Sequence, residues 1–164
     1  MDGYSNSTVE QTGTEHECYN GQASYYAWYE MYPKPGCKIS LAVRAGDVMV
    51  GEVKFIGQGK FVLSLKNLTT GKSYTTTQKS NQAVRQSAEW IVEAPWSGGV
   101  LPLANFGIEP FSNAFATISN QTGPISSFAY DKIDMYASDG VTVKALTSSP
   151  STDGTGFSVT WEHN

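Results

Sequence analysis

Apolar and polar residues alternate with a period of two along much of this chain. Between residues 25 and 32 the sequence reads Tyr-Tyr-Ala-Trp-Tyr-Glu-Met-Tyr. Successive side chains of an extended strand point to opposite sides. One face of this segment would therefore carry Tyr26, Trp28, Glu30 and Tyr32, and the residues between them would form the other face. The Pro-Lys-Pro-Gly sequence that follows ends the predicted strand.

Further strands are predicted where short runs rich in β-branched and aromatic residues recur. These runs lie at 39–43, 48–55, 61–66, 73–78, 89–93, 111–118, 132–136, 141–146 and 157–161. Turns are predicted at 57–59, 70–71, 138–140 and 153–154, where glycine supplies the positive φ of a tight hairpin. The segment 81–88 lacks the apolar stripe of a helix. Short, evenly spaced strands predict an all-β sandwich or barrel. No repeat or linker divides the chain, so residues 1–164 are predicted to form a single domain.

Composition and charge exclude several classes of partner. Only 16% of the residues are charged, and the net charge is -4. No cluster of Lys and Arg exceeds two residues, so nucleic acid is excluded as a partner because its binding rests on neutralising phosphates. No apolar run reaches the ~18 residues of a membrane-spanning helix. We therefore expect a monomer with neither a nucleic-acid nor a membrane partner.

The chain has two cysteines, Cys18 and Cys37. They form no Cys-x-x-Cys motif and no histidine cluster accompanies them, so neither a metal site nor another cofactor is expected. Outside the cell, a disulfide between them would close a short loop and stabilise the fold by about 3 kcal/mol. Two free thiols are the alternative. Sequons at Asn6, Asn67 and Asn120 matter only if the source glycosylates them.

Common catalytic motifs are absent from the sequence. It contains neither Gly-x-Ser-x-Gly nor His-Glu-x-x-His. Thr-Gly-Lys-Ser at 70–73 ends like a phosphate-binding loop, but Lys66 stands where the first glycine belongs, so a hairpin turn is expected. His16 and His163 are isolated. A histidine base would also be mostly protonated in acid, since its ordinary pKa is about 6.5.

Carboxylates and one glutamine remain as candidates for acid–base chemistry. Glu93 ends a predicted strand, where a carboxylate is by itself typical of a solvated edge. Glu30 stands between two aromatic residues on its face, and it could instead be a buried acid paired with Arg44, Arg85 or a tyrosine hydroxyl. Gln11 alone would be interpreted as a polar strand residue. Spacing by itself assigns a catalytic role to none of them.

Six segments, taken together, carry a resemblance to a known family. They read Asp-Gly at 2–3, Glu-Gln-Thr-Gly at 10–13, Tyr-Ala-Trp-Tyr-Glu-Met-Tyr-Pro at 26–33, Asn-Leu-Thr-Thr-Gly at 67–71, Ala-Glu-Trp-Ile-Val-Glu at 88–93 and Leu-Pro-Leu-Ala-Asn-Phe-Gly at 101–107. They follow the family's order and cover nearly the whole chain. The sequence resembles the glutamic peptidases, also called eqolisins.

The resemblance implies an antiparallel β-sandwich of two curved sheets, with a concanavalin-like jelly-roll architecture, in a protein that is secreted and active at low pH. In the family, Asp-Gly at 2–3 follows further strands and a Trp-Val-Gly segment that contains an active-site tryptophan. Here Met1 occupies the apolar position after that segment. We therefore expect the N-terminal strands, the signal peptide and any propeptide to be absent. Unpaired strand edges and an uncovered apolar face would follow.

The resemblance also implies the site residues. Gln11 and Glu93 match the family's catalytic pair. The positions that match its substrate groove are Asp2, Trp28, Glu30 and Tyr32. A glutamate can still be ionised in mild acid, where histidine cannot serve as a base. Glu93 is therefore expected to activate a water that attacks the peptide bond without a covalent intermediate, while Gln11 orients the water and donates to the oxyanion. The expected partner is a peptide or protein substrate.

Two other functions remain open. In a glycosidase or lectin-like module, Glu30 and Glu93 would be acid and base, and Trp28 would stack on sugar. A glycosidase needs carboxyl groups about 5–5.5 Å or about 6.5–9.5 Å apart. That function fails if Gln11, and not another carboxylate, is the closest polar partner of Glu93. The other possibility is a truncated, non-catalytic remnant of the peptidase.

Overall fold

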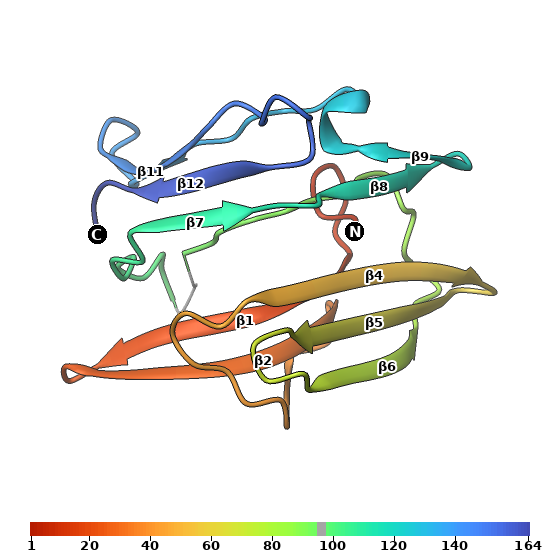
Figure 1. The fold of residues 1–164 in the computed structure, drawn as a ribbon, viewed down its shortest axis with the longest axis horizontal. Coiled ribbons are helices and arrows are strands. Elements are labelled where there is room, and N and C mark those ends of the chain that lie inside the picture. The colour runs from red at the N-terminus through yellow and green to blue at the C-terminus, as the bar shows by residue number, and fades with distance from the viewer. Residues whose placement is uncertain (95–97) are drawn as a thin grey trace. The chain divides into compact units, whose positions relative to one another are not determined.

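The computed structural model describes residues 1–94 and 98–164, which are almost entirely strand and loop (Figure 1). The strand pairs of these residues are antiparallel. A single 3-10 turn, η1 (Ile125–Ser127), is their only helical element, and no helix among them could cross a membrane. The predicted all-β antiparallel class is confirmed. The chain forms two compact units, Met1–Glu89 and Trp90–Asn164.

The first sheet of the first unit contains a long hairpin. Its strands β1 (Val9–Tyr19), β2 (Gln22–Tyr32) and β3 (Cys37–Ile39) are hydrogen-bonded in that order. The turn between β1 and β2 is formed by Asn20 and Gly21, both with positive φ (50° and 75°). Two such residues fit the right-handed twist of the flanking strands. The tight turn pairs Val9 with Tyr32 at the far end of the hairpin.

The second sheet of the same unit contains β4 (Met49–Gly57), β5 (Lys60–Asn67) and β6 (Ser73–Lys79), also in chain order. The predicted turn between β4 and β5 is confirmed, with Gln58 and Gly59 both at positive φ. A Cβ on Gly59 would lie 2.7 Å from the backbone oxygen of Ser80, so a larger residue does not fit there.

The core of the first unit takes side chains from both sheets. One cluster consists of Ala27, Ile39, Leu41 and Leu65, and a second consists of Met31, Phe61 and Leu63. Alternate residues of β2 therefore face this core. The opposite face of β2 carries the set that contains Trp28 and Glu30, as the period-two pattern predicts.

Asn67 ends β5 as a fully buried polar residue. Its Nδ2 donates to the backbone oxygen of Ala42 (3.2 Å) and to Oδ2 of Asp47 (2.7 Å), and its Oδ1 accepts from the backbone N–H of Thr70 (3.0 Å). These bonds hold two loops, the one before β4 and the one after β5, around the end of the strand. In the folded chain this sequon is therefore closed to glycosylation.

The second unit contains a four-stranded sheet in the order β10-β11-β12-β7 and a separate hairpin, β8-β9. Its strands are β7 (Ile108–Phe111), β8 (Phe115–Ile118), β9 (Gln121–Pro124), β10 (Met135–Tyr136), β11 (Val143–Thr147) and β12 (Phe157–Trp161). Leu103, Ala145 and Val159 are buried at its centre, and Phe111 and Phe157 stack with ring centroids 4.7 Å apart.

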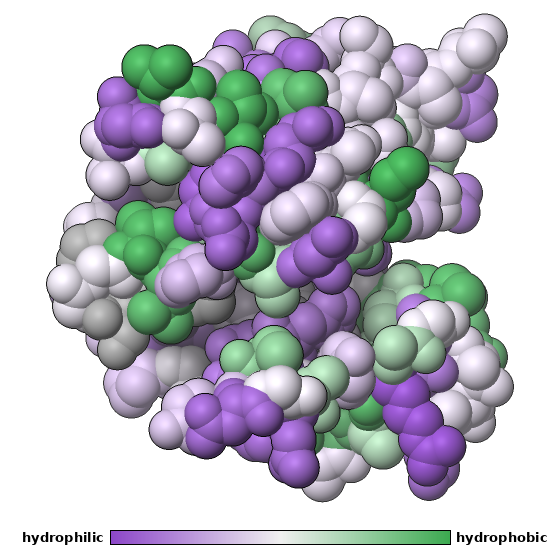
Figure 2. All heavy atoms as spheres, turned by 90° about the vertical axis from the view of Figure 1, so that its left-hand side faces the viewer, coloured by the Kyte–Doolittle hydropathy of each residue, from purple (hydrophilic) through white to green (hydrophobic). Residues whose placement is uncertain are grey.

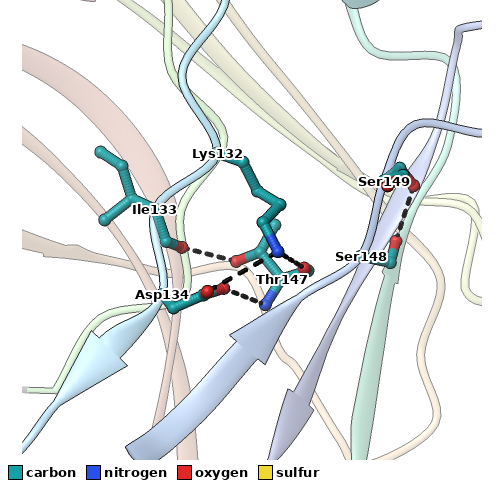
Figure 3. Close-up of polar contacts among 6 residues, drawn as sticks. All are labelled: Lys132, Ile133, Asp134, Thr147, Ser148 and Ser149. Carbon is teal, nitrogen blue, oxygen red and sulfur yellow. Dashed lines mark hydrogen bonds and ion pairs between the residues drawn. The ribbon is translucent and has the colours of Figure 1, made fainter.

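Just before β10, hydrogen bonds made by side chains take the place of the backbone hydrogen bonds of a regular strand pair (Figure 3). Oδ1 of Asp134 accepts from the backbone N–H of Thr147 (2.8 Å), and Nζ of Lys132 donates to the backbone oxygen of Thr147 (2.9 Å). The hydroxyl of Thr147 donates to the backbone oxygen of Ile133 (2.6 Å). The predicted strand 132–136 is therefore regular only in its last two residues.

Other predicted strands differ from the structure for identifiable reasons. The segment 89–93 is not a strand: Val92 packs into the core of the second unit, and the boundary between the units falls after Glu89. The predicted strand 111–118 divides into β7 and β8 because Asn113 adopts φ +53°, which a strand cannot contain. The predicted strand 39–43 is displaced, since β3 ends at Ile39.

Large apolar side chains are exposed at several points of the second unit, among them Ile108, Ile133 and Val141. On the face drawn in Figure 2, hydrophobic residues form separate patches among hydrophilic ones. Scattered apolar residues of this kind are ordinary on protein surfaces and do not mark a binding site by themselves.

Candidate active site

The face of the β1-β2 hairpin opposite the core brings together four of the predicted site residues. Gln11 lies directly across from Glu30, and Val9 lies across from Tyr32. Trp28 lies across from Gly13. The register thus gathers one carboxamide, one carboxylate and two aromatic side chains on a single face of two adjacent strands.

Glu30 is hydrogen-bonded to Gln11. Nε2 of Gln11 donates to Oε2 of Glu30 at 2.7 Å, in a partly buried setting. One alternative partner expected for a buried Glu30 lies elsewhere, since the guanidinium of Arg85 is over the ring of Phe55, 3.9 Å from its centroid. The carboxylate is thus paired with a neutral amide, an arrangement the sequence did not indicate.

Trp28 presents an unpaired donor on this face. Its Nε1 is buried and has no hydrogen-bond partner among the described residues. The indole lies against Gly13, where a Cβ would be 3.6 Å from the ring, while the hydroxyl of Thr12 donates to the backbone oxygen of Trp28 (2.8 Å). A buried N–H without a partner is uncommon in folded proteins and is a candidate for binding a ligand acceptor.

The same face continues to Tyr26 at the next pair along the strands. Lys38 lies over the Tyr26 ring at 4.2 Å from the centroid. Burial raises the pKa of Tyr26, and the hydrogen bond and negative charge of Glu15 raise it further. The phenol is therefore neutral at any pH at which the chain would work.

Asp2 is fully buried and bonded to the protein's own groups. It accepts from the backbone N–H groups of Val84 (3.0 Å), Arg85 (2.8 Å) and Gln86 (2.7 Å), and from Nδ2 of Asn6 (3.0 Å). Burial by itself raises its pKa, but the hydrogen bonds outweigh burial and lower the pKa. These contacts give Asp2 a structural role, while its contact with substrate stays a prediction.

Glu10 is a buried acid that sequence reasoning missed. It is fully buried beside Gln11 on the core side of β1. Burial raises its pKa to about 7, and the charge of Asp2 adds to the effect. Both carboxyl oxygens of Glu10 are buried without a hydrogen-bond partner among the described residues, so the acid is held in its neutral form up to about that pH. Strand parity was the available signal, because Gln11 on the outer face places Glu10 on the inner one.

The comparisons with known proteins identify the family. The model of the Peptidase A4 family matches residues 1–161. The chain belongs to the Peptidase A4 family. Aspergilloglutamic peptidase from Aspergillus niger has a similar solved structure, with a TM-score of 0.81 and 33% identity over 95% of this chain and 91% of that chain. Scytalido-glutamic peptidase, solved with a transition state analog inhibitor, shares the fold at a TM-score of 0.68 and 19% identity, over 98% and 80% of the two chains.

A curated relative covers more sequence than this chain contains. Aspergillopepsin-2 of Aspergillus niger is 37% identical over 130 residues, which is 75% of this chain and 46% of the relative. The chain thus spans about half the length of that relative. Membership of the Peptidase A4 family agrees with the resemblance stated from the six segments, and it gives the carbohydrate-active alternative no support.

Glu93 is exposed and belongs to the second unit, whereas Gln11 belongs to the first. The pairing of Gln11 with Glu93 in this Peptidase A4 member therefore stays a prediction. No group of three or more metal-binding side chains occurs within residues 1–94 and 98–164.

The predicted disulfide is wrong. Cys18 and Cys37 are both free and exposed. Cys18 lies opposite Ala23 on β2, and Cys37 lies opposite Tyr29, six residues farther along the same strand. Six residues of strand span about 20 Å. A disulfide requires Cα atoms within about 7 Å, so the register keeps these two thiols apart.

Proposed function

We propose that this chain acts as a secreted glutamic endopeptidase that hydrolyses peptide bonds in acid. Its membership of the Peptidase A4 family supports the proposal. So does the outer face of the β1-β2 hairpin, where the Gln11 carboxamide lies beside an unpaired indole donor. That face is the observation on which the proposal chiefly rests, because it offers hydrogen bonds that no part of the described chain uses.

In the proposed reaction Glu93 is the general base. Its carboxylate takes a proton from a water molecule, and the oxygen of that water attacks the scissile carbonyl carbon. The proton then passes from Glu93 to the leaving amine, so no covalent intermediate forms. Gln11 cannot titrate. Its amide oxygen accepts a hydrogen bond from the water, and an amide N–H donates to the oxygen on which negative charge develops.

The substrate is proposed to be an extended peptide lying along the outer face of β2. Trp28 and Tyr32 offer aromatic surface, and the Nε1 donor of Trp28 can bind a backbone carbonyl of the peptide. Such contacts recognise the peptide backbone and bulky apolar side chains without demanding one residue type. Selectivity is therefore proposed to be loose.

The test is cleavage of a denatured protein from about pH 2 to about pH 7 by the wild-type chain, Glu93→Gln and Glu162→Gln. Glu162 is an exposed carboxylate in the same unit and serves as the matched control. The wild type and Glu162→Gln should cleave in acid, and Glu93→Gln should lose at least about 10²–10⁴ in rate. Cleavage by Glu93→Gln at the wild-type rate, or none by the wild type, would contradict the proposal.

A further inference from the structure

The hydrogen bond between Gln11 and Glu30 joins two residues whose positions on the backbone are set by strand pairing. The two residues are direct partners in the antiparallel ladder of β1 and β2. The 2.7 Å distance from Nε2 of Gln11 to Oε2 of Glu30 is at the short end expected when the acceptor is a carboxylate. Gln11 and Glu30 therefore both lie on regularly paired strand backbone.

This bond determines which way the Gln11 carboxamide faces. In this bond the carboxyl oxygen of Glu30 accepts and the NH₂ group of Gln11 donates, so the NH₂ group of Gln11, and not its oxygen, faces Glu30. One of the two N–H bonds is used. Among the described residues Gln11 makes no other side-chain hydrogen bond, and its second N–H and Oε1 point to other sides of the amide.

Those two remaining groups are the ones that the proposed reaction needs. Oε1 can accept from the attacking water, and the second N–H can donate to the developing oxyanion. If the amide turned over, its oxygen would face Glu30 and the observed N–H bond to Glu30 would be lost. A freely rotating glutamine would also have to be immobilised during the reaction, which costs conformational entropy.

We propose that Glu30 is the positioning residue of the catalytic glutamine. The inference rests on the proposed function, since it assumes that Gln11 takes part in the reaction. Glu30 acts through Gln11: it holds one N–H, so that the amide oxygen and the other N–H are both presented to water and substrate. Its contribution is to the rate of the chemical step and not chiefly to substrate affinity.

The kinetic test compares Glu30→Ala and the isosteric Glu30→Gln with Glu15→Gln. Glu15 is a carboxylate on the same face of β1, opposite Tyr26, and is the matched control. Glu30→Ala should lower kcat by about 10–10²-fold and leave KM within about threefold, whereas Glu30→Gln, whose amide oxygen can still accept from Nε2 of Gln11, should keep most of the wild-type kcat. A residue that only binds substrate would raise KM with kcat unchanged, and that result would overturn the proposal.

A double-mutant cycle on Gln11 and Glu30 tests this proposal separately from the proposed function. In a Gln11→Ala background, Glu30→Ala should lower kcat by no more than about twofold further, because the group that it positions is already gone. A full additional loss would show that Glu30 acts independently and would overturn the proposal. Failure of the proposed function itself would be seen separately, as wild-type activity in Glu93→Gln.

A second measurement does not depend on activity. In ¹H–¹⁵N spectra, the two side-chain amide protons of Gln11, assigned with Gln11→Ala, should be widely separated because one is bonded to a carboxylate. Glu30→Ala should collapse that separation, and Glu15→Gln should leave it unchanged. Unaltered Gln11 amide resonances in Glu30→Ala would overturn the proposal even in a chain with no turnover.

Discussion

Replacing Glu10 with Gln should remove most of the dependence of stability on pH between about pH 4.5 and about pH 8. Glu10 is fully buried, and the ionisable groups around it are the carboxylates of Asp2 and Glu89 and the amino group of Met1. Ionised Glu10 would place a second negative charge beside buried Asp2. Protonated Glu10 carries no charge there, and a glutamine amide is neutral at any pH.

The magnitude follows from the pKa of Glu10, which rises from 4.5 to about 7 in the folded chain. At about 1.36 kcal/mol per unit, this corresponds to about 3 kcal/mol. The folded state holds the proton more tightly than the unfolded chain does. The stabilisation is therefore fully present below about pH 4.5 and is lost as the pH rises through about 7. For Asp2, whose pKa is lowered below 3.8, the sign is opposite, and its contribution is lost in stronger acid.

The assay is urea unfolding followed by tryptophan fluorescence at several pH values from about 4.5 to about 8. Glu17→Gln is the control, since Glu17 is an exposed carboxylate on the same strand. Glu10→Gln should match the wild type near pH 4.5 and exceed it by about 3 kcal/mol near pH 8. That difference is a large fraction of the 5–15 kcal/mol or so of a typical domain. Parallel profiles for Glu10→Gln and the wild type would refute the reasoning.

Three further changes have expected outcomes. Gln11→Ala should raise the barrier to peptide cleavage by about 2.7–4 kcal/mol, measured as kcat/KM in acid, and an unchanged value would exclude the proposed oxyanion donor. Asn67→Ala should lower the free energy of unfolding by about 2–3 kcal/mol, because it removes three partly buried hydrogen bonds of the Asn67 side chain, and a loss below about 0.5 kcal/mol would contradict this. Iodoacetamide should alkylate both Cys18 and Cys37 without a reductant, as counted by mass spectrometry, and an unmodified pair that requires reduction would contradict the register.

The parts of the fold that follow a local rule could be predicted from the sequence. The two faces of β2 follow from strand parity, and the Gly-Gln-Gly turn between β4 and β5 follows from the positive φ it requires. The strand β12 (Phe157–Trp161) also lies where its alternation predicts it. In these segments local pattern and tertiary packing favour the same structure.

The parts that depend on partners could not be predicted. The strand β1 is rich in polar residues and is defined by its pairing with β2, which no local pattern indicates. The segment 89–93 alternates like a strand, yet it pairs with no other strand, and Val92 packs into the core of the second unit. The disulfide was inferred from the compartment and the number of cysteines, whereas the register of β2 decides the distance between them.

The candidate site also has features that could be predicted from the sequence and features that could not. Trp28, Glu30 and Tyr32 lie on one face as the sequence indicated, and the register of β1 against β2 adds Gln11 to that face. Their interactions could not be predicted, because the bond between Gln11 and Glu30 depends on which residues of two strands lie opposite each other. The depth of burial of Glu10 likewise depends on the packing of the N-terminal segment against β1.

The most direct test of the central claim is a double-mutant cycle on Gln11 and Glu93, with kcat/KM measured on a denatured protein in acid. If the two residues act on one water, each single change removes most of the catalysis that the pair supplies. Gln11→Ala combined with Glu93→Gln should then be only slightly slower than the slower single variant. A double variant whose loss equals the product of the two single losses would show independent action and contradict the claim.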